Sequence, residues 1–137
     1  MCLQNIDKEL KYKDGKGWKV FRVEGKKLYP CSMDGRKTPW REGVYYKSRR
    51  GFITDDTYGS PTLGQRYPMG FHVIPTKNEA IIYTKTMNTC PDIRFVMRRV
   101  EYKGASTSGE TTLWFLGGEV YRGPCAVARE MKILPRN

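Results

Sequence analysis

The sequence has little of what most often carries catalysis or binds a metal. It contains one histidine, His72, and four cysteines, Cys2, Cys31, Cys90 and Cys125, and no two cysteines form a Cys-x-x-Cys pair. Because a structural zinc site takes four Cys or His ligands, usually at short spacings, we expect no metal. A nucleophilic Cys–His pair would need the fold to bring His72 to a cysteine, and a histidine inside an apolar strand is more often a structural residue.

The motifs that define several enzyme classes are missing as well. The sequence has neither of the standard glycine-rich phosphate loops and no Gly-x-Ser-x-Gly element. This removes the support for hydrolysis at a P-loop and for acyl transfer at a nucleophile elbow. Adjacent carboxylates occur only at Asp55-Asp56, and such a pair in a flexible segment is more typical of a turn than of a cation site.

Long apolar runs are also absent. No run reaches the roughly 20 residues that a helix needs to cross a bilayer, and the first residues lack the basic, apolar and small-residue regions of a secretory signal. We therefore expect a cytoplasmic protein with free thiols and no membrane contact.

Acidic residues are few, and positive charge is abundant. The chain has 25 Lys and Arg residues against 14 Asp and Glu residues, a formal net charge of +11. Such a field attracts polyanions, so DNA, RNA, a nucleotide or an acidic protein surface is an expected partner. The alternative is that the charge only keeps a small protein soluble.

At 137 residues the chain is expected to form a single domain, residues 1–137, alone or as a homo-oligomer. Short alternating or β-rich runs predict strands at residues 18–23, 28–31, 43–46, 70–74, 93–102 and 127–133, and a hairpin over 113–122 around Gly117-Gly118. Thr76 and Glu79 form a capping-box pattern at the start of a helix of about three turns. Glycines and prolines interrupt residues 47–69, which predicts a long central loop. The predicted fold is α+β, a mainly antiparallel curved sheet with one principal helix.

Basic residues alternate with aromatic residues along much of the chain, as in Trp18-Lys19, Trp40-Arg41 and Tyr45-Tyr46-Lys47. Aromatic stacking combined with positive charge is how single-stranded nucleic acid or a free nucleotide is held. The alternative is that the aromatic residues form the core and the basic residues are their solvated neighbours. The candidate ligand contacts are Arg22, Arg41, Arg49, Arg50, His72, Arg98, Arg99 and Lys103.

Three segments together resemble a family of small phage-encoded accessory proteins. They are the N-terminal Met1-Cys2-Leu3, the run from Gly70-Phe71-His72-Val73 to Glu79-Ala80, and the C-terminal Val127-Ala128-Arg129-Glu130-Met131-Lys132-Ile133. Proteins of this kind often act against host defence. The resemblance implies a counter-defence protein of the host cell cytoplasm that binds a nucleotide signal, a nucleic acid or an acidic host effector without turnover and without a cofactor.

Two further functions remain open. The glycine-aromatic strand that runs into a capped helix with Ala80 and Tyr83 is similar to a segment of ADP-ribosyltransferase-like folds. That resemblance implies an enzyme using NAD, in which Arg22 orients the dinucleotide and Glu130 stabilises the transition state, while Ala128 stands where the Gln of a Gln-x-Glu motif would be. A structural or assembly protein of the virion is the third hypothesis.

Overall fold

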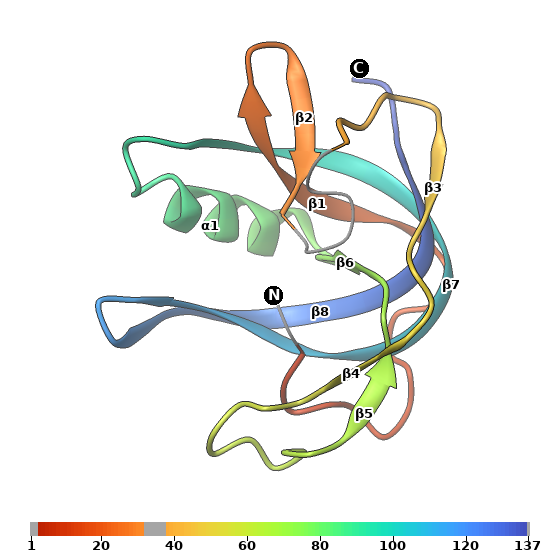
Figure 1. Ribbon diagram of the computed structural model, residues 1–137, viewed down its shortest axis with the longest axis vertical. Coiled ribbons are helices and arrows are strands. Elements are labelled where there is room, and N and C mark those ends of the chain that lie inside the picture. Colours follow the sequence, from red (N-terminus) through yellow and green to blue (C-terminus); the bar gives the residue numbers. More distant parts are fainter. Residues whose placement is uncertain (1–2, 32–37, 137) are drawn as a thin grey trace.

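The computed structural model describes residues 3–31 and 38–136 (Figure 1). The elements in chain order are β1 Gly15–Glu24, β2 Lys27–Pro30, β3 Tyr45–Lys47, β4 Phe52–Thr54, β5 Arg66–Pro68, β6 Phe71–Val73, α1 Lys77–Met87, β7 Arg94–Phe115 and β8 Gly118–Ile133. The fold is a mainly antiparallel sheet with one short helix, so the predicted α+β class is confirmed.

The sheet is built around the long β7–β8 hairpin. Its strand order is β2-β1-β7-β8-β3, with β6 also paired to β8, and all of these pairings are antiparallel. The hairpin is strongly bent, and α1 and β6 lie in the mouth of the bend (Figure 1). The sheet is not closed, although Trp18 and Ile74 exchange backbone hydrogen bonds of 2.8 and 2.7 Å that tie β1 to the end of β6.

The helix forms where the capping pattern predicts it. The Thr76 side chain accepts a hydrogen bond of 3.3 Å from the backbone N–H of Glu79, while the Glu79 carboxylate accepts one of 3.4 Å from the Tyr121 hydroxyl. Ala80 and Tyr83 are buried, and they pack into a cluster with Val20, Ile74, Phe95 and Tyr121. The helix is therefore held by burial of one face against β1, β7 and β8.

The main core lies between β1, β6, β7 and β8. Phe21, Trp40 and Phe71 meet there, and Trp40 also stacks on Tyr46 at a centroid distance of 4.5 Å. For aromatic residues that lie next to basic ones, the sequence left two interpretations open, a stacking platform for a ligand or a core residue. Phe21, Trp40 and Tyr102 are core residues, because these side chains are at most 5% exposed.

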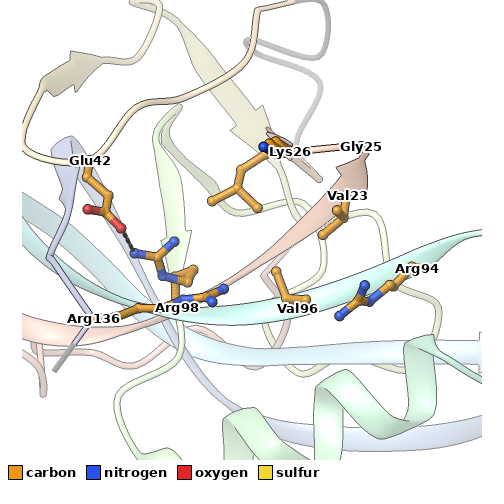
Figure 2. Close-up of a pocket in the computed structure, with 9 residues that line it drawn as sticks. Val23, Gly25, Lys26, Glu42, Arg94, Val96, Arg98 and Arg136 are labelled. Carbon is orange, nitrogen blue, oxygen red and sulfur yellow. Dashed lines mark hydrogen bonds and ion pairs between the residues drawn. The ribbon is translucent and has the colours of Figure 1, made fainter.

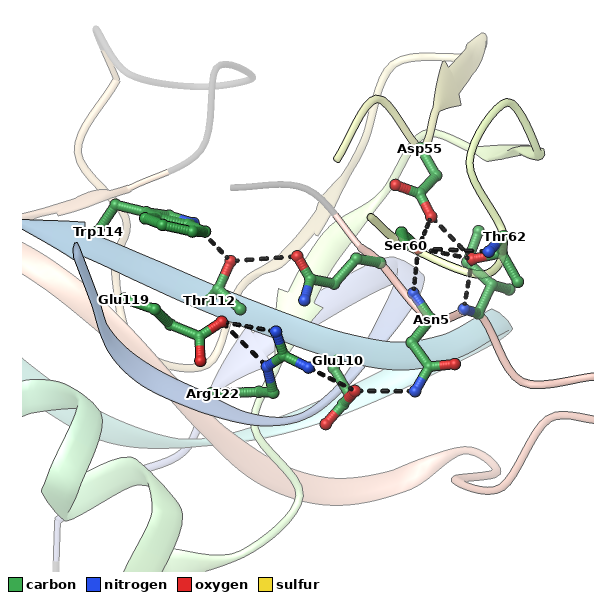
Figure 3. A network of polar contacts seen from close by, with 11 residues as sticks. Asn5, Asp55, Ser60, Thr62, Glu110, Thr112, Trp114, Glu119 and Arg122 are labelled. Atoms are coloured by element: carbon green, nitrogen blue, oxygen red, sulfur yellow. Dashed lines mark hydrogen bonds and ion pairs between the residues drawn. The ribbon is translucent and has the colours of Figure 1, made fainter. Parts of the chain in front are cut away.

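The predicted long central loop over residues 47–69 contains two short strands that were not predicted, and residues 55–65 connect them. Phe52–Thr54 pairs with Arg66–Pro68 as a second, two-stranded antiparallel sheet, and the connection is closed by Asp55 (Figure 3). Its fully buried carboxylate accepts hydrogen bonds of 2.7 Å from Ser60 Oγ and 2.7 Å from Thr62 Oγ1. Gly and Pro mark the turns here, but the two strands have only three residues each, too few for an alternating pattern to emerge.

The remaining strand predictions are confirmed with shifted bounds. β1, β2, β6 and the 113–122 hairpin form as expected, and the predicted strands over 93–102 and 127–133 are the ends of much longer β7 and β8. The predicted strand at 43–46 is β3, displaced to Tyr45–Lys47.

Candidate functional site

A basic pocket of about 350 Å³ lies between the β1–β2 hairpin and the start of β7 (Figure 2). Its lining comes from four separate stretches of chain, which the fold brings together at one end of the sheet. We call it the basic pocket, and its lining residues are Val23, Gly25, Lys26, Leu28, Glu42, Arg94, Val96, Arg98 and Arg136.

The register of β1 on β7 explains how this lining forms. Val23 pairs with Arg94, and four positions further along β7 Arg98 pairs with Lys19. Because residues two apart on a strand share a face, Arg94, Val96 and Arg98 point to the same side of the sheet. The tight turn at Gly25, where φ is +60°, carries Lys26 over that face.

The Arg98 guanidinium is held in one position in the pocket by two partners. Its side chain is 7% exposed and forms an ion pair with Glu42, which is drawn as a dashed line in Figure 2. A second hydrogen bond of 3.1 Å runs from Arg98 Nη2 to the carbonyl oxygen of Leu134. A buried guanidinium held from two sides is preorganised, because its rotamer is set before any ligand arrives.

The other three cations of the pocket are exposed. The side chains of Lys26, Arg94 and Arg136 have no hydrogen-bond or ion-pair partner within residues 3–31 and 38–136. With Arg98 they give the described lining four cationic side chains against the single carboxylate of Glu42. That carboxylate is already paired, so the pocket presents an excess of positive charge to solvent.

This arrangement fits an anion with an apolar part. Guanidinium and ammonium groups hold phosphate oxygens by charge-assisted hydrogen bonds, and Val23, Leu28 and Val96 supply aliphatic surface beside them. Glu42 is the only carboxylate of the described lining, and it is paired with Arg98. The described lining therefore offers binding groups and no free general base or nucleophile.

Lys19 and His72 are two further buried ionisable residues, and Lys19 lies opposite Arg98 in the β1–β7 ladder. Lys19 is 4% exposed, and its Nζ donates a hydrogen bond of 3.2 Å to the carbonyl oxygen of His72. Burial lowers the pKa of Lys19 below its ordinary value, against a smaller opposing effect of Cys31 and Cys125. Burial, together with the charge of Lys19, lowers the pKa of His72 to about 3, so its ring is neutral at pH 7.

The predicted contact residues do not share one site. Arg98 lies in the basic pocket and Arg50 in a second pocket. His72 is 5% exposed, and neither ring nitrogen has a hydrogen-bond partner in the described part of the chain. Such a side chain does not meet a ligand at the surface of this fold, so the structure does not support the predicted contact at His72.

The remaining predicted contacts lie elsewhere on the surface. Arg22 pairs with Glu24 and lies 4.9 Å from the centroid of the Tyr29 ring. Lys103 Nζ lies 4.2 Å from the centroid of the Tyr45 ring. Arg41, Arg49 and Arg99 are exposed and line neither pocket.

Arg22 and Glu130, the two residues of the transferase hypothesis, lie on different strands of the sheet. Arg22 pairs across β1 and β7 with Phe95, whereas Glu130 pairs across β7 and β8 with Lys103. Phe95 and Lys103 are eight positions apart on β7, a path of about 26 Å at 3.3 Å per residue. Arg22 and Glu130 therefore lie in different strand pairs, and the transferase hypothesis stays a prediction.

Three cations of the pocket and its carboxylate were not among the predicted contacts. Arg94 could have been predicted as a contact, because it lies four residues before Arg98 in the same strand and therefore on the same face of the sheet. Lys26, Glu42 and Arg136 come from a turn, a connection and the C-terminal segment. No periodicity in the sequence links those segments to β7.

In residues 3–31 and 38–136, no group of three or more His, Cys, Asp or Glu side chains is placed to hold a metal ion. No helix of that same part is both long and apolar enough to span a membrane. Comparisons with models of known protein families, with curated proteins and with solved structures found no match to this chain.

Proposed function

We propose that this protein binds a phosphate-bearing ligand in the basic pocket and holds it without turnover, a free nucleotide being the class that fits best. The observation that carries the proposal is the excess of cations in one pocket, where the single carboxylate is already paired with Arg98. The formal net charge of +11 adds long-range attraction for such a ligand.

The shape of the site favours a small ligand over a protein surface. Pockets for small molecules and cofactors have volumes of roughly 300 to 1,000 Å³, and the basic pocket has about 350 Å³. Together with the resemblance to phage accessory proteins, this supports a counter-defence role in which the protein sequesters a nucleotide signal. Binding of a nucleic acid or of an acidic host effector is the alternative that the experiment below separates.

The test is native mass spectrometry of the full chain after incubation with mononucleotides, cyclic oligonucleotides and short RNA, followed by calorimetric titration of whatever is retained. The double variant Arg94→Gln/Arg136→Gln removes two exposed cations from the pocket. We expect it to weaken nucleotide binding by about tenfold or more, because hydrogen bonds to charged groups contribute about 1.5–3 kcal/mol each. Because binding occurs without turnover, the nucleotide recovered from the protein should be chemically unchanged.

The matched control is Arg99→Gln/Lys103→Gln, which removes the same charge from exposed positions on the other face of β7. Equal losses in the two double variants would mean that overall charge, and not the pocket, attracts the ligand, and would reject the site. Retention of RNA or of a host protein with no nucleotide bound would reject a nucleotide as the ligand.

A further inference from the structure

A second pocket of about 400 Å³ lies where the bend of β7 and β8 meets the segments flanking the small β4–β5 sheet. It shares no residue with the basic pocket and contains different chemistry. We call it the corner pocket, and its lining residues are Arg50, Gly51, Phe52, Pro68, Met69, Gly104, Ser106 and Arg129.

The walls of the corner pocket are tied together by Ser48, which is 4% exposed. Its backbone N–H donates to the carbonyl oxygen of Arg129 at 2.9 Å, and its hydroxyl lies 3.2 Å from the carbonyl oxygen of Met69. The N–H of Met69 in turn donates to the carbonyl oxygen of Gly51 at 2.9 Å. Three separate stretches of chain are thus held as one unit before a ligand binds.

The floor of the pocket is the bend itself. Gly104 has a φ of +67°, and an added Cβ would lie 2.8 Å from the Cβ of Arg129, so only glycine leaves room for that arginine. The Asp14 carboxylate accepts hydrogen bonds from the N–H groups of Gly104 and Ala105 at 3.0 and 2.8 Å. Ser106 lies at the register shift that follows, and such β-bulges commonly redirect a side chain beside a binding site.

The groups around this floor are two cations and an aromatic ring. The side chains of Arg50 and Arg129 have no hydrogen-bond or ion-pair partner in the described parts of the chain, and Arg129 is half-buried. Phe52 is 61% exposed although the Arg66 guanidinium lies 4.6 Å from its ring centroid. A partly buried cation without a counter-charge attracts an anion, and an exposed ring next to it offers a stacking surface.

We propose that the corner pocket binds a nucleotide monophosphate unit, with the base stacked on Phe52 and the phosphate held by Arg50 and Arg129. The unit is either a free nucleoside monophosphate or one nucleotide of a longer chain. The described lining of the basic pocket contains no aromatic residue, so the two sites differ in chemistry. The corner site does not rest on the function proposed for the basic pocket.

The test is an NMR titration of the full chain with AMP, with uridine and with inorganic phosphate. AMP should shift the amide signals of Gly51 and Gly104 and the methyl signal of Met69. Phe52→Leu should weaken AMP binding about tenfold, as expected when a base loses a stacking partner, and Arg129→Gln should weaken it similarly. If Arg129→Gln does not fold, Arg50→Gln at an exposed position makes the same test.

Arg94→Gln, in the basic pocket, is the control and should leave these shifts unchanged. The proposal is overturned if inorganic phosphate alone reproduces the AMP shifts and Phe52→Leu has no effect. It is also overturned if Arg94→Gln abolishes the binding of AMP, which would place the nucleotide in the basic pocket. A short RNA that binds more tightly than AMP, and that Phe52→Leu also weakens, would identify the longer chain as the source of the unit.

Discussion

Lys19 and Arg98 lie directly opposite each other in the antiparallel ladder of β1 and β7, and both side chains are buried. Like charges at such positions repel, since their side chains point to the same face. Each cation turns to a different acceptor: Arg98 pairs with Glu42, and Lys19 donates to the carbonyl oxygen of His72. Of these two cations, only Arg98 has a counter-charge within the described residues, so the buried charge of Lys19 lowers the stability of the folded protein.

Lys19→Met should therefore leave the protein as stable at pH 7 or stabilise it by about 1–2 kcal/mol, because replacing a buried charge with an apolar side chain is often neutral or favourable. The folded pKa of Lys19 is lowered by burial, so the unfolded chain binds more protons. The free energy of unfolding must therefore rise with pH between the lowered pKa of Lys19 in the folded state and its unfolded pKa near 10.4. In the Lys19→Met variant, the free energy of unfolding measured in urea at pH 7, 8.5 and 10 should not show this rise. Lys16→Met, an exposed lysine on the same strand, serves as the comparison and should keep it.

His72→Leu should make the protein less sensitive to acid. Its pKa of about 3 in the folded state lies below the unfolded value of 6.5, so wild-type stability falls as the pH drops from 6.5 towards 3. The loss is at most about 5 kcal/mol at 1.36 kcal/mol per pH unit. Because neither ring nitrogen has a hydrogen-bond partner in the described chain, the variant loses no side-chain hydrogen bond there. Urea midpoints at pH 7 and 4.5 should differ less in the variant, and an unchanged difference would contradict the burial of an unpaired neutral ring.

Glu42→Gln should separate binding from stability in the basic pocket. The change removes the only carboxylate of its described lining, so we expect nucleotide affinity to rise several-fold. Arg98 would lose its counter-charge while 7% exposed. Because Glu42 is about half exposed, the cost should be about 1–2 kcal/mol, less than that of breaking a fully buried pair. Calorimetric titration and thermal unfolding measure the two effects, and a fall in affinity would argue against an anion in this pocket.

Gly104→Ala should destabilise the bend of the β7–β8 hairpin by about 2–4 kcal/mol. It adds backbone strain at a φ of +67° and a steric conflict with the Arg129 Cβ, 2.8 Å away. Gly25→Ala is the matched control, since Gly25 has a φ of +60° and nothing within 4 Å of an added Cβ; its cost should be about 1 kcal/mol. Equal losses in chemical denaturation would show that the backbone alone, and not Arg129, requires the glycine.

Asp55→Ala should loosen both the β4–β5 connection and the N-terminal segment. Ser60 and Thr62 donate to the Asp55 carboxylate, and their oxygens accept the backbone N–H groups of Asn5 and Ile6 at 3.0 and 2.9 Å (Figure 3). Losing a buried acceptor of several hydrogen bonds should cost about 2–3 kcal/mol. Amide exchange at Asn5 and Ile6 should become faster.

Asp56→Ala, at the exposed neighbour, should change neither stability nor exchange. Burial acts to raise the pKa of Asp55, but the hydrogen bonds from Ser60, Thr62 and Thr57 outweigh it and lower the pKa below 3.8. The stability that Asp55 contributes is therefore present above the unfolded pKa and lost as the pH falls through the lowered folded value. If Asp55→Ala and Asp56→Ala behave alike, the network is not what anchors the N-terminal segment.

Local patterns identified most of the elements because their physical causes are local. Thr76 and Glu79 are three residues apart, so the start of the helix is determined by residues within a single turn. Gly117 adopts the positive φ of the predicted hairpin turn, but Leu116 and not Gly118 is the other residue with a positive φ. The three-residue strands β4 and β5 escaped detection because they are specified by pairing with each other and by Asp55, not by any alternation of their own.

Composition and alternation along the strands determined that this is a basic, mainly antiparallel α+β protein, because charge and strand periodicity are properties of neighbouring residues. They also placed Arg98 among the contact residues. Only the tertiary structure decided which charged residues share a pocket. Pairings between distant segments bring Lys26, Glu42 and Arg136 to the start of β7. The same pairings buried His72, Phe21 and Trp40. Burial depends on what packs over a side chain, which a one-dimensional pattern does not contain.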